Sequence, residues 1–152
     1  IWHHGDFAKI TDNGGFIIFG RSDTTLNPGG VRLGTAEIYN VVEKLNEIEE
    51  SIVIGQSWNN DIRIILFVVL NKGYVLTEKI KSKIKKEIKI NATPRHVPSK
   101  IISISEIPKT KNGKLVELAV KQSVEGEVIK NLEALANPDS LKQFRNIKEL
   151  NE

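Results

Sequence analysis

Two β-branched segments separated by a short polar turn limit the possible folds more than any other feature of this sequence. Residues 48–57 (IEESIVIGQS) and 62–70 (IRIILFVVL) are strand-sized and rich in isoleucine and valine, which favour strands. Only residues 58–61 separate them, so two consecutive strands are predicted. The longest apolar run, residues 64–70, is much shorter than the ~20 residues of a membrane helix. We therefore expect no membrane partner.

Helix-period patterns lie on both sides of these strands. The first predicts a helix over residues 36–46, with Thr35 as a plausible N-cap. Its apolar stripe consists of Ile38, Val41, Val42 and Leu45. The second pattern, over residues 77–90, predicts an amphipathic helix whose polar face is covered by lysines. The lysine face is more simply interpreted as a solvated surface than as a binding site.

The remaining segments complete a small layered domain. Turn chemistry at residues 12–15 precedes a short strand over residues 16–20, and residues 24–33 predict a hairpin with a Pro-Gly corner. A further strand over residues 101–107 is followed by a lysine-rich loop and a short helix marked by three valines, Val116, Val120 and Val124. Residues 137–144 predict a surface helix that needs a partner to stay ordered. The order predicts an α+β fold with a short mixed sheet.

Composition excludes several classes of function. The 152 residues contain no cysteine, which excludes disulfides, thiolate metal sites and cysteine nucleophiles and fits a cytoplasmic location. A net charge of +3 with 6% aromatic residues does not fit a dedicated nucleic-acid binder. The chain also lacks methionine and opens on apolar and aromatic residues, so we expect it to be a fragment that continues upstream.

The first motif is WHHGD near the N-terminus. Adjacent His3 and His4 point apart on a strand and form a poor chelate with Asp6, so we predict no metal site here. A strand end entering a turn is the plain structural interpretation. In the functional interpretation, the Asp6 carboxylate accepts hydrogen bonds from a vicinal diol such as a ribose.

The second motif, GRSDTTLNPGGVRLGTAEIY, spans residues 20–39. It is either a charged hairpin with surface arginines or a site where glycines admit a ligand and arginines meet phosphate or ribose oxygens. The third motif, IPKTKNGK, spans residues 107–114. It is either an ordinary surface loop or a mobile carrier of Lys114, which would neutralise charge on a phosphoryl group or carboxylate.

Together, in this order and spacing, the three motifs resemble the C-terminal motifs of the adenylate-forming enzymes, a superfamily that includes acyl-CoA synthetases. The resemblance covers residues 1–126. Three segments are most similar to members that act on acetoacetate: LNPGGVRLGTAEIY, TPRHVPSKII and the tail VEGEVIKNLEALANPDSLKQF. Members that act on acetate typically carry serine at the position of Gly29. An acetyl- or propionyl-CoA synthetase fragment, or a binding module without chemistry, is the alternative.

The resemblance implies a domain layout and a set of substrates. Residues 1–22 would end a large N-terminal adenylation domain, residues 23–126 would form a small swivelling domain, and residues 127–152 would form a C-terminal helical extension. The enzyme would use ATP, coenzyme A and Mg²⁺, with the Mg²⁺ ligands upstream. Its own N-terminal domain would be the partner, and the fragment alone would be inactive.

The resemblance also implies roles for single residues. Asp6 and Arg21 would hold the ribose hydroxyls, Asp23 would be the hinge, and Arg32 would contact the phosphates of ATP. Gly30 would line the pantetheine tunnel.

Two lysines receive roles in the same way. Lys85 would meet the nucleotide phosphate of coenzyme A. Lys114 would be the catalytic residue, reaching the acyl carboxylate and the α-phosphate during adenylation.

Overall fold

A three-stranded mixed sheet forms the centre of the molecule, as predicted. The computed structural model describes residues 6–10, 16–21, 26–112, 116–129 and 132–151, the first two ranges by their backbone alone. The sheet order is β3 (Ile48–Trp58), β4 (Asp61–Leu70) and β5 (Lys100–Ser103). β3 and β4 are antiparallel, whereas β4 and β5 are parallel and joined through α2 (Glu78–Asn91). The predicted α+β class is confirmed.

The turn between β3 and β4 is a tight two-residue hairpin loop. Asn59 and Asn60 both have positive φ, 49° and 62°, between the paired residues Trp58 and Asp61. This is the type I′ geometry that matches the twist of flanking strands, and asparagine tolerates it. The turn fixes the register, so that Gln56 and Arg63 lie opposite each other.

Both faces of the sheet are buried, which explains the unbroken apolar run in β4. Ile64, Leu66 and Val68 point into one core cluster, and the residues between them, Ile65, Phe67 and Val69, point into a second. Successive side chains of a strand point to opposite faces, so a strand covered on both sides needs apolar residues at every position.

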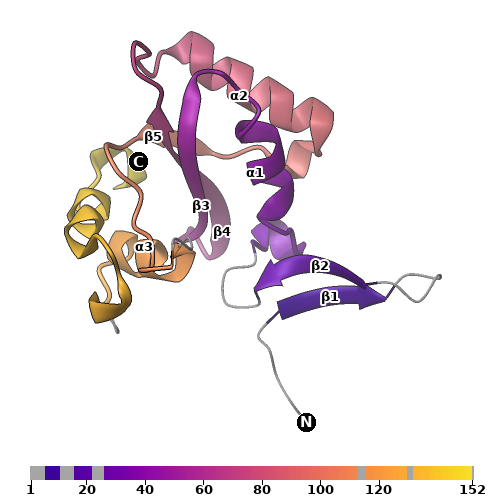
Figure 1. The fold of residues 1–152 in the computed structure, drawn as a ribbon. Coiled ribbons are helices and arrows are strands. Elements are labelled where there is room, and N and C mark those ends of the chain that lie inside the picture. The colour runs from indigo at the N-terminus through magenta and orange to yellow at the C-terminus, as the bar shows by residue number, and fades with distance from the viewer. Residues whose placement is uncertain (1–5, 11–15, 22–25, 113–115, 130–131, 152) are drawn as a thin grey trace.

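The first face is covered by two regular helices, α1 (Ala36–Val42) and α2, which lie together on one side of the sheet in Figure 1. Ile38 of α1 and Ile84 and Ile88 of α2 are fully buried there. Thr77 caps α2, because its side chain accepts a hydrogen bond from the Ile80 N–H at 3.3 Å. The helix predicted over residues 77–90 is confirmed.

The second face is covered by α3 (Glu117–Val124) and by the C-terminal segment, which lie on the opposite side of the sheet in Figure 1. We call residues 127–152 the extension. Its described part forms three short 3₁₀ helices, at Leu132–Ala134, Pro138–Phe144 and Lys148–Asn151. Phe144 is fully buried, and its ring meets that of Phe67 edge-on, with centroids 4.8 Å apart.

The expected surface helix at residues 137–144 is therefore wrong in two respects. The segment is a 3₁₀ helix, and it contributes core residues, with Leu141 and Phe144 only 3% and 0% exposed. Its apolar residues are three apart, which suits three residues per turn and gives one buried edge. The segment finds its packing partner in its own sheet.

Two local predictions also differ from the structure. The first helix ends at Val42 rather than at residue 46, and the side chain of Thr35 makes no capping hydrogen bond. Thr35 has helical φ and ψ (−75°, −24°), whereas a capping side chain needs an extended backbone. The strand predicted over residues 101–107 is confined to β5, because the chain after Ser103 turns from the sheet toward the extension.

A separate two-stranded sheet precedes this domain. β1 (Asp6–Ile10) and β2 (Phe16–Arg21) pair antiparallel, and Figure 1 shows them apart from the main sheet. The strand predicted over residues 16–20 is confirmed and extends by one residue. In the described part of the chain, no helix is long and apolar enough to cross a membrane.

Candidate functional site

The glycine corner is a 3₁₀ turn, Pro28–Gly30, fastened at its base and its tip. At the base, Leu26 and Leu33 form an antiparallel bridge, with N–H to O distances of 3.0 and 2.6 Å, and Leu26 is fully buried. At the tip, Gly29 and Gly30 have φ of 61° and 80°, a region that favours glycine. A Cβ added to either glycine would meet nothing within 4 Å, so the tip is open.

Asp61 holds this tip, and sequence reasoning missed it. The Gly29 N–H donates to both oxygens of the Asp61 carboxylate, at 3.0 and 3.3 Å. The same carboxylate accepts from the Ile62 N–H at 2.8 Å. The hairpin turn of the main sheet therefore positions the corner. No local pattern links residues 32 positions apart, so the sequence carried no signal for this contact.

Arg32 and Lys85 lie on the same side of the sheet as the corner. Arg32 is exposed two residues after Gly30, while its neighbour Leu33 belongs to the first core cluster. Lys85 is half-buried on α2, next to Ile84 of the same cluster. The structure thus places Gly30, Arg32 and Lys85 on elements that cover one face of the sheet.

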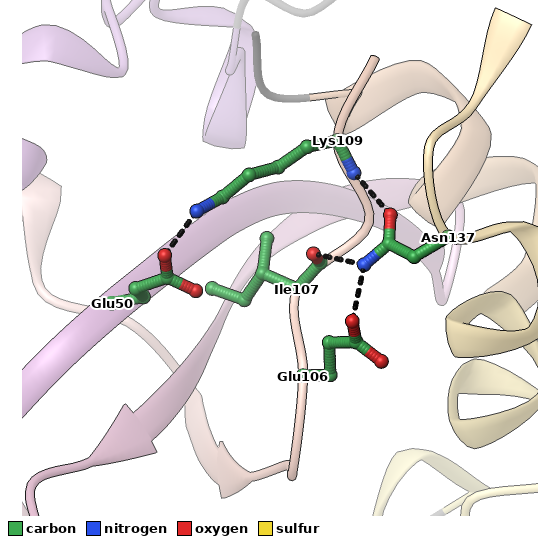
Figure 2. Close-up of polar contacts among 5 residues, drawn as sticks. All are labelled: Glu50, Glu106, Ile107, Lys109 and Asn137. Atoms are coloured by element: carbon green, nitrogen blue, oxygen red, sulfur yellow. Dashed lines mark hydrogen bonds and ion pairs between the residues drawn. The ribbon is translucent and has the colours of Figure 1, made fainter. Parts of the chain in front are cut away.

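The loop that leads to Lys114 leaves from the other side. Figure 2 shows Lys109 between β3 and the extension. Its ammonium group is paired with the carboxylate of Glu50 on β3, and its N–H donates to Asn137 Oδ1 at 2.9 Å. Asn137 and Glu50 are further residues that the sequence analysis did not single out.

Tyr39 connects the two sides around the edge of the sheet. Its hydroxyl donates to Glu117 Oε1 of α3 at 2.7 Å and accepts from the Val53 N–H of β3 at 3.0 Å. Burial, together with the nearby Glu117 carboxylate, raises the pKa of the Tyr39 hydroxyl well above its ordinary value. Tyr39 therefore stays protonated and donates this hydrogen bond throughout the physiological pH range.

A buried histidine, His96, lies next to Glu37 of α1. His96 is 6% exposed, and its Nδ1 lies 2.7 Å from Thr93 Oγ1. Burial lowers the pKa of His96 below its ordinary value, while the Glu37 carboxylate, 3.9 Å from Nε2, opposes that shift. The neutral ring is thus favoured, and it packs within the helical side of the domain.

For several predicted site residues, the structure describes only the backbone or does not describe the residue at all. Asp6 and Arg21 are directly opposite each other in the β1–β2 register, but only their backbone is described. His3, His4, Asp23 and Lys114 lie outside the described residues. Within the described ranges, no group of three or more His, Cys, Asp or Glu side chains could hold a metal ion.

Known proteins resemble this chain along nearly its whole length. It is 56% identical over 150 residues to an acetoacetyl-coenzyme A synthetase of Rhizobium meliloti (strain 1021), covering 99% of this chain and 23% of that protein. It superposes on a solved acetoacetyl-CoA synthetase from Streptomyces lividans with a TM-score of 0.87 and 38% identity, again over 99% and 23% of the two chains. The chain therefore spans less than a quarter of these relatives.

A more distant structure matches less of the chain. An acyl-CoA synthetase from Brucella canis superposes with a TM-score of 0.65 at 23% identity, over 81% of this chain and 23% of that one. This likeness concerns the fold alone. The matches to the two acetoacetyl-CoA synthetases confirm the resemblance that the three sequence motifs indicate. Since residues 37–114 match a family model, the chain belongs to the AMP-binding enzyme C-terminal domain family.

Proposed function

We propose that this chain is the C-terminal part of an ATP-dependent acyl-CoA synthetase that activates acetoacetate. The match to acetoacetyl-CoA synthetases over 99% of the chain carries the proposal. A carboxylate oxygen of acetoacetate attacks the α-phosphorus of ATP and displaces pyrophosphate. The thiolate of coenzyme A then attacks the carbonyl carbon of acetoacetyl-AMP, and AMP leaves.

The proposed layout has three parts. Residues 1–22 belong to the end of the adenylation domain, residues 23–126 form the swivelling domain, and residues 127–152 form the extension. The separate β1–β2 sheet supports a boundary after residue 22. The resemblance to acetoacetyl-CoA synthetases supports placing the Mg²⁺ ligands in the upstream domain. The partner is that domain, and the location is the cytoplasm.

In this proposal the ribose and phosphates of ATP are held near the boundary. Asp6 and Arg21 bind the ribose hydroxyls, and their positions opposite each other in the β1–β2 register support a joint role. Asp23 is the hinge. Arg32, exposed beside the glycine tip, contacts the phosphates.

The residues assigned to coenzyme A and the loop that leads to the adenylation lysine belong to opposite sides of the small domain, and Arg32 shares the side of the coenzyme A residues. Gly30 lines the passage for pantetheine, and Lys85 meets the nucleotide phosphate of coenzyme A. Lys114 stabilises charge on the carboxylate and α-phosphate during adenylation. The arrangement of the sheet supports this division, because the glycine corner and the loop before Lys114 are attached to opposite faces. A rotation of the domain then exchanges one set of groups for the other.

The proposal is tested in the full-length enzyme by measuring each half-reaction separately. We expect acetoacetate to be a better substrate than acetate or propionate in pyrophosphate exchange. Lys114→Ala should abolish adenylation but largely spare thioester formation from preformed acetoacetyl-AMP. Equal loss of both half-reactions would contradict the role of Lys114, and a preference for acetate would contradict the assigned substrate.

The tunnel role of Gly30 needs a control for backbone strain. Any side chain at Gly30 is strained, because φ is 80°, but the domain itself leaves space for one. Gly30→Ala carries this strain without bulk, whereas Gly30→Leu adds the bulk. We expect Gly30→Leu to block thioester formation and spare pyrophosphate exchange, while Gly30→Ala changes both only modestly. Similar thioester rates in the two variants would refute a narrow passage at this position.

A further inference from the structure

After β5, the backbone of residues 105–111 is held by the extension rather than by β4. The last backbone hydrogen bond to β4 runs from the Ile104 N–H to the Val68 carbonyl, at 2.9 Å. Immediately afterwards, the N–H and hydroxyl of Ser105 both donate to Gln143 Oε1, at 2.8 Å each. Gln143 Nε2 in turn donates to the Glu106 carbonyl at 3.1 Å. The extension thus takes over the backbone where the sheet ends.

Farther along, the two segments pair like short strands. Thr110 and Leu135 form an antiparallel bridge. The Ala136 N–H donates to the Lys109 carbonyl at 2.9 Å, and the Lys111 N–H donates to the Ala134 carbonyl at 3.1 Å. This pairing carries ordered backbone to within three residues of Lys114 along the chain. Three residues span at most ~10 Å, so the paired backbone limits where the lysine can go.

The side chain of Asn137 fastens the same segment at its centre (Figure 2). Its Oδ1 accepts from the Lys109 N–H at 2.9 Å. Its Nδ2 donates to the Ile107 carbonyl at 3.0 Å and to Glu106 Oε1 at 2.8 Å. One amide group thereby bridges residues on both sides of Pro108, which has no N–H of its own to donate.

Packing and charge hold the opposite side of the segment. Ile107 is 1% exposed and lies in the second core cluster with Leu135 and Phe144 of the extension. The Lys109 ammonium group is paired with Glu50 of β3. The segment is therefore fixed between β3 and the extension, and Asn137 supplies the polar contacts to its backbone.

From these contacts we propose that Asn137 is a positioning residue for the adenylation half-reaction. It fixes the backbone of residues 106–109, from which the lysine loop begins. The inference rests on the proposed function, because it gains meaning only if Lys114 acts in adenylation. It assigns the extension a specific task in the reaction, namely holding the base of that loop.

The test uses Asn137→Ala in the full-length enzyme. Misplacing a catalytic group by about 1 Å costs up to ~100-fold in rate, so we expect pyrophosphate exchange to fall between ~10-fold and ~100-fold. Thioester formation from preformed acetoacetyl-AMP should stay within about twofold, because that step does not use the lysine. Hydrogen exchange at the Lys109 and Lys111 amides should become faster.

A matched control weakens a different attachment of the extension. Gln56 is a buried amide whose Nε2 donates to the Leu150 carbonyl at 3.2 Å and whose Oε1 accepts from Arg63 Nε at 2.8 Å. Gln56→Leu removes both hydrogen bonds but leaves the bond from Arg63 Nη2 to the Leu150 carbonyl, at 2.7 Å, and the contacts of Asn137 in place. We expect a lower melting temperature with both half-reactions nearly unchanged. If Gln56→Leu slows adenylation as much as Asn137→Ala does, the effect is general loosening, and the positioning role is refuted.

A charge-swapped pair provides a rescue. Asn137→Asp keeps an acceptor for the Lys109 N–H but places a carboxylate beside Glu106, so adenylation should fall. Adding Glu106→Gln supplies a donor to the new carboxylate and should recover a large part of the lost rate. No recovery in the double variant would contradict a role through these hydrogen bonds.

The outcomes separate this inference from the proposed function. If Lys114→Ala leaves adenylation intact, the proposed function of the lysine fails, and the inference fails with it. If Lys114→Ala abolishes adenylation while Asn137→Ala changes neither half-reaction, only the inference is overturned. If Asn137→Ala reduces both half-reactions equally, the residue has a structural role alone.

Discussion

The two faces of the central sheet are buried to a similar degree by very different means. On the helical face, α1 and α2 contribute apolar stripes at regular helical spacing, such as Ile84 and Ile88. On the extension face, α3 is joined by two 3₁₀ helices that contribute one or two buried apolar side chains each, such as Phe144 and Leu150. The first face relies on repeated local pattern, and the second relies on a few long-range contacts.

The family model follows the same division. It covers residues 37–114, which include nearly all of α1, the whole of α2 and the main sheet but none of the extension. The helical face and the sheet thus belong to the shared family domain, and the extension face is completed by residues that the family model does not include.

The largest expected effect comes from deleting residues 127–152. The deletion removes Leu135, Leu141, Phe144 and Leu150, each at most 7% exposed. Burying such a side chain is worth about 1.5–3 kcal/mol, and whole domains are stable by only ~5–15 kcal/mol. We expect the shortened chain to lose cooperative unfolding in urea, as followed by circular dichroism. A cooperative transition at an unchanged urea concentration would show that the extension is not part of the core.

Single large-to-small substitutions compare the two faces directly. Phe144→Ala should lower the free energy of unfolding by about 3–5 kcal/mol and Ile88→Ala by about 2–5 kcal/mol, because both side chains are fully buried. Urea unfolding of the 152-residue chain measures both. If Phe144→Ala lowers the free energy of unfolding by less than about 1 kcal/mol, the extension lies on the surface without contributing to the core.

The comparison also explains what the sequence could and could not predict. The strands around residues 58–61 and the lysine-rich helix follow from β-branched runs and a 3.6-residue period, so local pattern sufficed for them. The surface helix predicted over residues 137–144 is wrong because a 3₁₀ segment with two buried apolar side chains, Leu141 and Phe144, has too little periodicity to show that it is buried.

The same limit applies to the candidate site. The motifs carrying Gly30, Arg32 and Lys114 were visible because their residue types and spacing are distinctive. The residues that hold these motifs, Asp61 and Asn137, act across 32 and 28 positions of sequence. Hydrogen bonds of this kind depend on the fold, and no spacing rule within one sequence predicts them.

An intermediate effect is expected where the sheet holds the glycine corner. Asp61→Ala removes the acceptor of the Gly29 N–H and should lower the free energy of unfolding by about 1 kcal/mol. Asp61→Asn keeps one acceptor oxygen and serves as the control. Hydrogen exchange at the Gly29 amide should accelerate in the alanine variant and much less in the asparagine variant. Equal protection in both variants would show that the bridge between Leu26 and Leu33 holds the corner by itself.

The smallest expected effect is a loss of stability at acidic pH. This loss should begin on the side of the sheet that α1 and α2 cover. Because burial lowers the pKa of His96 below 6.5, the unfolded chain binds the proton first as the pH falls. The free energy of unfolding should therefore decrease as the pH drops below 6.5 and level off below the folded-state pKa, while above 6.5 both states are neutral. His96→Asn should flatten this slope in urea titrations between about pH 8 and pH 5. If the free energy of unfolding of the variant depends on pH as steeply as before, a titratable group other than His96 causes the pH dependence. Because His96 Nε2 lies 3.9 Å from Glu37 of α1, amides of α1 should also lose protection before those of residues 138–144.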